Sequence, residues 1–189
     1  MIMEQYGWTL YGTRTVYRSP WIQVDLADIR SPSGDRFEHA VARLQRIAIA
    51  LLVNERDEAL MLRRHRFAVD KWGYELLGGL VEPDEDPAAA AAREALEESG
   101  YRVLGEPEHL ATYEPLPGMI TAETSLYLWR RFERVQDPSD PDEAGTLSWI
   151  PVTRVPEMTR TGQLLGAGTL IALYAFLHVR GADPSAIGG

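Results

Sequence analysis

The chain has 189 residues, which is the length of one ordinary domain or of one domain with a small appendage. With 45% hydrophobic and 25% charged residues, its composition is typical of a soluble globular protein with a sizeable core. The absence of cysteine excludes disulfides, thiolate metal sites and cysteine nucleophiles, and the net charge of −9 argues against nucleic acid or an anionic membrane as the main partner.

Residues 6–46 are predicted to be β structure, because three segments alternate between apolar and polar residues, at 13–19, 21–30 and 36–44. Residues 47–54 form a short apolar run that suits a buried strand. A turn and a return strand at 59–67 are expected next. Residues 72–79 are predicted to be extended and to end in a glycine pair.

A helix is predicted after this glycine pair. Asp86 is a typical N-cap residue, Pro87 suits the first helical position and Gly100 suits the C-terminal cap. Beyond the helix the chain predicts, in order, strands at 102–113 and 124–134, a loop at 136–145, a strand at 146–152, a short helix or turn at 153–160 and a helix at 168–180.

This order of elements predicts an α/β or α+β domain with a sheet between helices. We expect an N-terminal antiparallel β region at 1–45, a main domain at 46–181 and a disordered tail at 182–189. The N-terminal sequence lacks the features of a signal peptide, so we expect a cytoplasmic protein. The longest apolar run, 168–179, is about eight residues short of a membrane span and is predicted to be a core helix, so no membrane partner is expected.

Three glutamates lie close together in the predicted central helix. Glu94, Glu97 and Glu98 are i, i+3 and i+4 neighbours, and they fall within roughly a 100° arc of the helical wheel. We expect these carboxylates to point away from the sheet. The opposite side is expected to pack on the sheet and carries Ala88, Ala92, Ala95 and Leu96.

The helix alone permits two interpretations of these glutamates. In one, they form a solvated acidic face on which Arg93 and Glu97 make an i, i+4 ion pair. In the other, they bind a divalent cation, which removes a like-charge repulsion of about 0.2–0.5 kcal/mol per pair. A hard cation such as Mg²⁺ takes oxygen ligands and keeps positions open for the phosphates of a substrate.

The stretch from Gly79 to Tyr101 matches a longer pattern at every fixed position, GX5EX7REUXEEXGU, in which U is apolar. This pattern is the Nudix box, so the chain resembles the Nudix hydrolases. The resemblance implies an α/β/α sandwich with a mixed sheet, preceded here by the N-terminal antiparallel β region. It also implies hydrolysis of a nucleoside diphosphate linked to another moiety, with Mg²⁺ as the cofactor and Mn²⁺ as the alternative.

The flanking segments resemble those of ADP-ribose pyrophosphatases and other nucleoside-diphosphate-sugar hydrolases. LRRHRF…WGYELLGG is similar to their L-x-R-Q-Y-R…W-x-x-E-L-P-A-G, and YEPLPGMITAE is similar to a Y-x-x-x-P-G loop that ends in a glutamate. Pro117 lies 16 residues past Tyr101, as in that subfamily. The segment GQLLGAGTLIAL is similar to their G-x-I-x-D-A-K-T-L-x-A-L helix. Members commonly pair through an N-terminal β region, which implies a homodimer.

Two departures from this subfamily bear on substrate choice. Leu77-Gly78 replaces the Pro-Ala pair whose second carbonyl is a metal ligand in the family. Gly78 still offers a carbonyl, in a backbone of greater freedom. The start of the last helix carries Gly166 and Gly168 in place of the family's Asp and Lys.

The resemblance implies metal-binding roles for several residues of the box. Glu94 and Glu98 are the first choice as ligands, together with the carbonyl of Gly78, and Glu97 binds the metal or a water on it. Arg93 is expected to support these glutamates through ion pairs. Glu85 is expected to orient Arg93 or to bind the metal through water, and each of these acids has a plain surface role as its alternative.

The general base has two candidates. Glu123 lies on a loop that begins at Gly118 and is expected to close over the substrate, and Glu97 is the rival base. A surface acid at a strand edge is the other interpretation of Glu123.

Substrate contacts are predicted outside the helix. Arg66 is the candidate for a bidentate phosphate contact and Arg64 is its alternative, with a surface role equally open for either. Trp21 and Trp72 are candidates for stacking on a nucleobase, against a place in the core or an interface. The remaining candidate substrate-binding residues are Gly79, Pro117 and Gly118.

The function expected from this resemblance is Mg²⁺-dependent hydrolysis of a nucleoside diphosphate sugar, with ADP-ribose giving AMP and ribose 5-phosphate. One alternative is another nucleotide substrate, such as GDP-mannose, another sugar nucleotide or a nucleoside triphosphate. The other is a non-catalytic nucleotide-binding regulator, against which the complete set of box glutamates argues.

Overall fold

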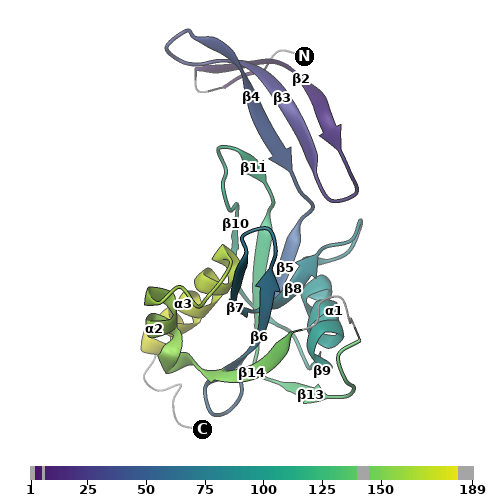
Figure 1. Ribbon diagram of the computed structural model, residues 1–189, viewed down its shortest axis with the longest axis vertical. Helices are drawn as coiled ribbons and strands as arrows, with labels where there is room; N and C mark the ends of the chain where they lie inside the picture. Colours follow the sequence, from purple (N-terminus) through teal and green to yellow (C-terminus); the bar gives the residue numbers. More distant parts are fainter. Residues whose placement is uncertain (1–2, 6, 140–144, 183–189) are drawn as a thin grey trace. The chain divides into compact units, whose positions relative to one another are not determined.

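The computed structural model describes residues 3–5, 7–139 and 145–182 (Figure 1). Residues 183–189 of the predicted tail and residues 140–144 of the predicted loop at 136–145 lie outside the described residues. The chain divides into two compact units, one with residues 1–45 and 114–123 and the other with residues 46–113 and 124–189. None of the described helices combines the length and apolar character that a membrane crossing requires.

The first unit is a five-stranded sheet in the order β1-β2-β3-β4-β11. Its strands are β1 (Met3–Gln5), β2 (Trp8–Arg18), β3 (Gln23–Arg30), β4 (Arg36–Arg43) and β11 (Ile120–Thr121). The three alternating segments of the sequence correspond to β2, β3 and β4. Residues 114–123, which the sequence analysis placed within 46–181, group with this unit because β11 pairs in parallel with β4, with Ile120 opposite Ala42.

The second unit contains three sheets. A mixed sheet has the order β10-β12-β5-β8, an antiparallel sheet has the order β14-β6-β7, and β13 pairs with β9. In chain order the strands are β5 (Ile47–Leu52), β6 (Glu58–Arg66), β7 (Lys71–Glu75), β8 (Leu77–Leu80), β9 (Tyr101–Val103), β10 (Glu108–Tyr113), β12 (Thr124–Trp129), β13 (Phe132–Arg134) and β14 (Thr146–Pro151).

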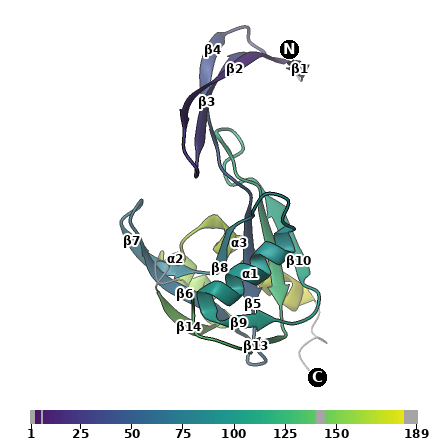
Figure 2. The same ribbon diagram turned by 90° about the vertical axis from the view of Figure 1, so that its right-hand side faces the viewer.

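Helices cover both sides of these sheets, which confirms the predicted layered α+β fold. Figures 1 and 2 show α1 (Pro87–Ser99) on one side and α2 (Val155–Arg160) and α3 (Ala167–Ala182) on the other. A single 3₁₀ turn, η1 (Val152–Arg154), leads into α2. The predicted strand at 102–113 is interrupted between β9 and β10, where Gly105 has a φ of 77° and Pro107 follows.

Strand β5 is the centre of the core because both of its faces are buried. Leu51 belongs to a cluster that includes Leu173 and Phe176 of α3. Ala48 and Ala50 belong to the second cluster, together with alanines of α1. Small side chains on both the strand and the helix allow α1 to lie close to the sheet, which places the residues of this helix beside β8.

The buried face of α1 differs from the predicted one. Its buried residues are Ala90, Ala91, Ala95, Glu98 and Ser99. The prediction that all three glutamates point away from the sheet is therefore wrong for Glu98. The predicted ends of the helix are confirmed: the side chain of Asp86 caps the first turn, and Gly100 ends the helix with a φ of 74°.

Candidate active site

Two glycines of β8 allow two carboxylates of α1 to approach the backbone. A Cβ on Gly79 would lie 2.5 Å from the carboxyl carbon of Glu94, so a side chain at this position would displace the carboxylate. The backbone N–H of Gly78 donates a hydrogen bond of 2.8 Å to Oε2 of Glu98. Gly78 has a φ of 155°, and a Cβ there would overlap the carbonyl oxygen of Ala48. Glu94 and Glu98 thus meet the same glycine pair.

Glu98 is a buried carboxylate held by a buried arginine. Nη1 of Arg64 donates to Oε1 of Glu98 at 2.8 Å, and Nε of Arg64 donates to Oε2 of Glu75 at 2.9 Å. Arg66 donates to the same oxygen of Glu75 at 2.8 Å. The antiparallel pairing of β6 and β7 places Arg64, Arg66 and Glu75 together, since alternate residues share a face.

Arg93 connects the other acids of the box. It donates to Glu85 at 3.1 Å, to Glu94 at 2.8 Å and to Glu97 at 3.0 Å. It also donates to the carbonyl oxygen of Leu80 at 3.0 Å, which ties the helix to the end of β8. The hydrogen bonds from Arg93 lower the pKa of Glu85 below its usual value, and those bonds with Glu85 raise the pKa of Arg93. The i, i+4 pair of Arg93 and Glu97 is present within this larger network.

The predicted site residues fall in both units. The second unit brings together the box residues, Gly78, Arg64 and Arg66. Trp72, in the same unit, lies under the guanidinium of Arg63, with 5.0 Å between the guanidinium carbon and the ring centroid. The first unit contains Trp21, Pro117, Gly118 and Glu123.

Within the first unit these residues lie in loops. Trp21 is exposed in the turn between β2 and β3, and Glu123 is exposed after β11. The carbonyl oxygen of Gly118 accepts a hydrogen bond of 2.7 Å from Nε2 of His39. The roles of these residues toward a substrate stay predictions.

Glu75 is the residue that the sequence analysis missed. It bridges two arginines and is largely buried, with its side chain 14% exposed. The resemblance contained a signal, because Glu75 is the acid of the segment WGYELLGG. The local sequence contained none, because an acid between a tryptophan and an apolar pair does not predict a bridge between two arginines.

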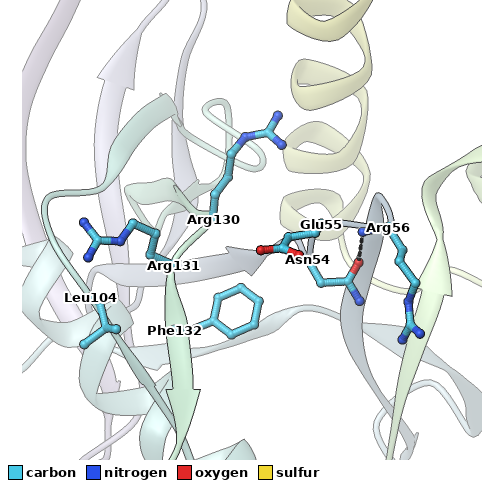
Figure 3. A pocket seen from close by; sticks show the side chains of 7 residues that line it. All are labelled: Asn54, Glu55, Arg56, Leu104, Arg130, Arg131 and Phe132. Carbon is cyan, nitrogen blue, oxygen red and sulfur yellow. Dashed lines mark hydrogen bonds between the residues drawn. The ribbon is translucent and has the colours of Figure 1, made fainter. Parts of the chain in front are cut away.

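A pocket of about 540 Å³ lies elsewhere in the second unit. Its lining residues follow β5, follow β9 and lead into β13: Asn54, Glu55, Arg56, Leu104, Arg130, Arg131 and Phe132. Figure 3 shows the guanidinium groups of its three arginines pointing in different directions. The pocket contains no residue of the box. It is therefore distinct from the site at which Glu94 and Glu98 meet the Gly78-Gly79 pair, which we call the carboxylate site.

A family model described as the NUDIX domain matches residues 43–165. This chain belongs to the NUDIX family. The match spans the box, the glycine pair and the arginines of β6.

Relatives and solved structures agree with this membership. The CMP-5′-(N-acetyl-N-hydroxy-3-aminopropyl)phosphonate hydrolase of Streptomyces rubellomurinus is 41% identical over 93% of this chain and 84% of its own length. The GDP-mannose pyrophosphatase of Salmonella arizonae is 29% identical over 70% of this chain and 73% of its own length. The crystal structure of an ADP compounds hydrolase is similar with a TM-score of 0.80 and 18% identity, covering 95% of this chain and 97% of that chain, which confirms the NUDIX fold.

NUDIX hydrolases as a family use divalent cations, and the donor chemistry of this site fits a hard cation. The observation is that Glu94 packs on Gly79 while Glu98 binds the amide of Gly78, so two carboxylates meet one glycine pair. Among the described residues, no group of three acidic or histidine side chains is arranged to hold a metal ion by itself. The guanidinium groups of Arg64 and Arg93 hold these carboxylates instead.

Proposed function

We propose that this protein hydrolyses, with Mg²⁺ or Mn²⁺, the phosphoanhydride that joins a nucleoside 5′-monophosphate to a second phosphorus group. The observation that carries the proposal is the meeting of Glu94 and Glu98 at the Gly78-Gly79 step. The pair Arg66–Glu75 adds a guanidinium that is 42% exposed and retains N–H groups for a phosphate. An acidic protein thereby holds an anionic substrate through cations and one arginine.

Two substrates in this class have specific support. A nucleoside diphosphate sugar of the ADP-ribose type, which would give AMP and ribose 5-phosphate, is supported by the flanking segments and by the relative named for GDP-mannose. A CMP-linked phosphonate is supported by the greater identity, 41% over 93% of the chain, to a hydrolase named for such a compound. Both compounds present a nucleoside monophosphate bonded to a second phosphorus atom.

In the proposed reaction, the residues of the chain have three roles: holding the cation, accepting a proton and keeping the carboxylates in place. Glu94 and Glu98, with the carbonyl of Gly78, would hold the cation. When bound, it neutralises phosphate charge and lowers the pKa of a water. Glu123 or Glu97 would accept the proton of the attacking water. Arg93 would keep Glu94 and Glu97 in place, as its two hydrogen bonds to them indicate.

The test is a substrate panel with purified protein and Mg²⁺. It contains ADP-ribose, GDP-mannose, a CMP-linked phosphonate and a nucleoside triphosphate, with nucleoside monophosphate as the measured product. We expect turnover of at least one of the first three, and a loss of about 100-fold or more in Glu98→Gln. The matched control is Glu133→Gln, because Glu133 is an exposed acid of β13 that pairs with Arg102, outside the box.

The outcomes of the panel distinguish the two substrates, the role of Glu98 and the non-catalytic alternative. Turnover of the CMP-linked phosphonate alone would discard the ADP-ribose assignment and keep the reaction. Turnover of the triphosphate alone would discard both substrates. A Glu98→Gln protein with full activity would remove the metal-ligand role from Glu98. Binding of these nucleotides without any turnover would support the non-catalytic regulator.

A further inference from the structure

Arg64 is more buried than the other two arginines of the carboxylate site, Arg66 and Arg93, and it pairs with two carboxylates. Its side chain is 6% exposed, and the side chain of Glu98 is 1% exposed. The guanidinium spans two carboxylates, since Nη1 donates to Glu98 and Nε donates to Glu75. A planar fork is suited to this bridge, whereas the single ammonium of a lysine is not.

This bridge fixes the orientation of the Glu98 carboxylate. Oε1 of Glu98 accepts from Arg64, and Oε2 accepts from the amide of Gly78, each at 2.8 Å. A buried carboxylate without such partners is strongly destabilising, because it loses its hydration without compensation. Arg64 therefore supplies the positive charge that Glu98 requires when the site holds no cation.

The same charge acts against a divalent cation. A guanidinium 2.8 Å from a carboxylate oxygen competes for that oxygen and repels a second positive charge close by. Arg64 and Arg66 both pair with Glu75, so Arg64 keeps one carboxylate partner when Glu98 binds a cation. Without a metal, the two positive charges of these arginines offset the two negative charges of Glu75 and Glu98.

We propose that Arg64 is a positioning residue that acts as the internal counter-ion of Glu98, aligning this carboxylate and lowering its affinity for the divalent cation. The inference rests on the proposed function, because it assigns Glu98 to the cation. It gives Arg64 a role different from a phosphate contact: the side chain is buried and turned to two acids, whereas Arg66 is the more exposed of the pair.

The experiment compares Mn²⁺ binding to the full chain and to Arg64→Gln, measured by the loss of the EPR signal of free Mn²⁺. Glutamine removes the charge and keeps amide N–H donors for the two carboxylates, and circular dichroism checks that the variant is folded. We expect Mn²⁺ to bind Arg64→Gln about fivefold or more tightly than the wild type, at the lower end of typical couplings between linked sites. Added Mg²⁺ should also raise the melting temperature of Arg64→Gln more than that of the wild type.

Three further variants isolate the cause. Arg64→Lys keeps the charge but not the bridge to both carboxylates, so its Mn²⁺ affinity should lie closer to the wild-type value than that of Arg64→Gln. Arg63→Gln removes the neighbouring arginine, which lies over Trp72 on the other face of β6, and should leave Mn²⁺ affinity unchanged. In a background of Glu98→Gln, the effect of Arg64→Gln should disappear, because coupling requires both partners.

The outcomes separate the two proposals. A wild type that binds no Mn²⁺ overturns the metal dependence in the proposed function. A wild type that binds Mn²⁺ while Arg64→Gln binds it equally or more weakly overturns the counter-ion role and leaves the proposed function standing. If Arg64→Gln does not fold, Arg64→Lys carries the test: because it keeps the charge, Mn²⁺ binding by Arg64→Lys that is about fivefold or more tighter than wild-type binding would overturn the counter-ion role.

Discussion

At the scale of single residues, the box acids divide between two arginines. Glu85, Glu94 and Glu97 share Arg93, whereas Glu98 has Arg64. The contacts of Arg93 were predictable because helical spacing and the box motif place these acids near it. The burial of Glu98 was not, because its partner lies 34 residues away on another element and the helical wheel contains no information about the sheet.

Glu85 should contribute to stability in a pH-dependent way. Its folded pKa is lowered by Arg93, so its contribution is present above the unfolded pKa, about 4.3, and is lost as pH falls through the folded pKa. We expect Glu85→Gln to lower the free energy of unfolding at neutral pH by less than about 1 kcal/mol, because the pair is partly exposed to solvent.

Urea unfolding of both proteins from pH about 7 to about 3.5 measures this difference, which should narrow on the acid side. Glu82→Gln is the control, because Glu82 is exposed and contributes a backbone N–H, not its carboxylate, to the contact with Glu85. A difference that stays constant across this range would contradict the assignment.

At the scale of elements, α1 was the best predicted part because its limits are encoded locally. Asp86, Pro87 and Gly100 each act within one turn of the helix. The strand at 124–134 was predicted as one element, but β12 ends at Trp129 and β13 begins at Phe132. That break follows from the partners, since β12 pairs with β5 and β13 pairs with β9, and pairing between distant segments is not written in local periodicity.

The N-cap of α1 should be a measurable source of stability. Oδ1 of Asp86 accepts hydrogen bonds from the backbone N–H groups of Ala88 at 2.9 Å and Ala89 at 3.2 Å. We expect Asp86→Ala to lower the free energy of unfolding by about 1 kcal/mol, and Asp86→Asn to preserve it, because asparagine caps as well as aspartate. Urea denaturation of the two variants tests this, and equal losses would show that the cap is not the cause.

At the scale of the whole molecule, the family pattern extends over both units and the solved neighbour covers 95% of the chain. The sequence predicted a sheet region at the N-terminus and the layered domain after it. It did not predict that residues 114–123 join the first unit, because β11 is only two residues long and has no pattern of its own. Its place depends on the edge of β4, which is free to take a parallel neighbour.

The sheet of the first unit should associate with a second copy of the chain. Of its described residues only Thr9, Asp25, Ala27 and Ala122 are buried, and the described part of this unit contains strands but no helix. Trp8 and Phe37 are both exposed and contact each other edge to face, with 6.4 Å between ring centroids. Exposed apolar rings on a sheet surface are typical of an interface.

We therefore expect light scattering after size-exclusion chromatography to give twice the chain mass of 21.2 kDa. Phe37→Asp should reduce this to one chain mass, because a charge in the interface would lose its hydration without a partner. Phe67→Asp is the matched control, since Phe67 is 90% exposed on the β6–β7 hairpin of the second unit. A wild-type monomer would refute the dimer. A dimer that survives Phe37→Asp but dissociates with Phe67→Asp would move the interface to the hairpin, where two exposed residues, Val69 and Trp72, accompany Phe67.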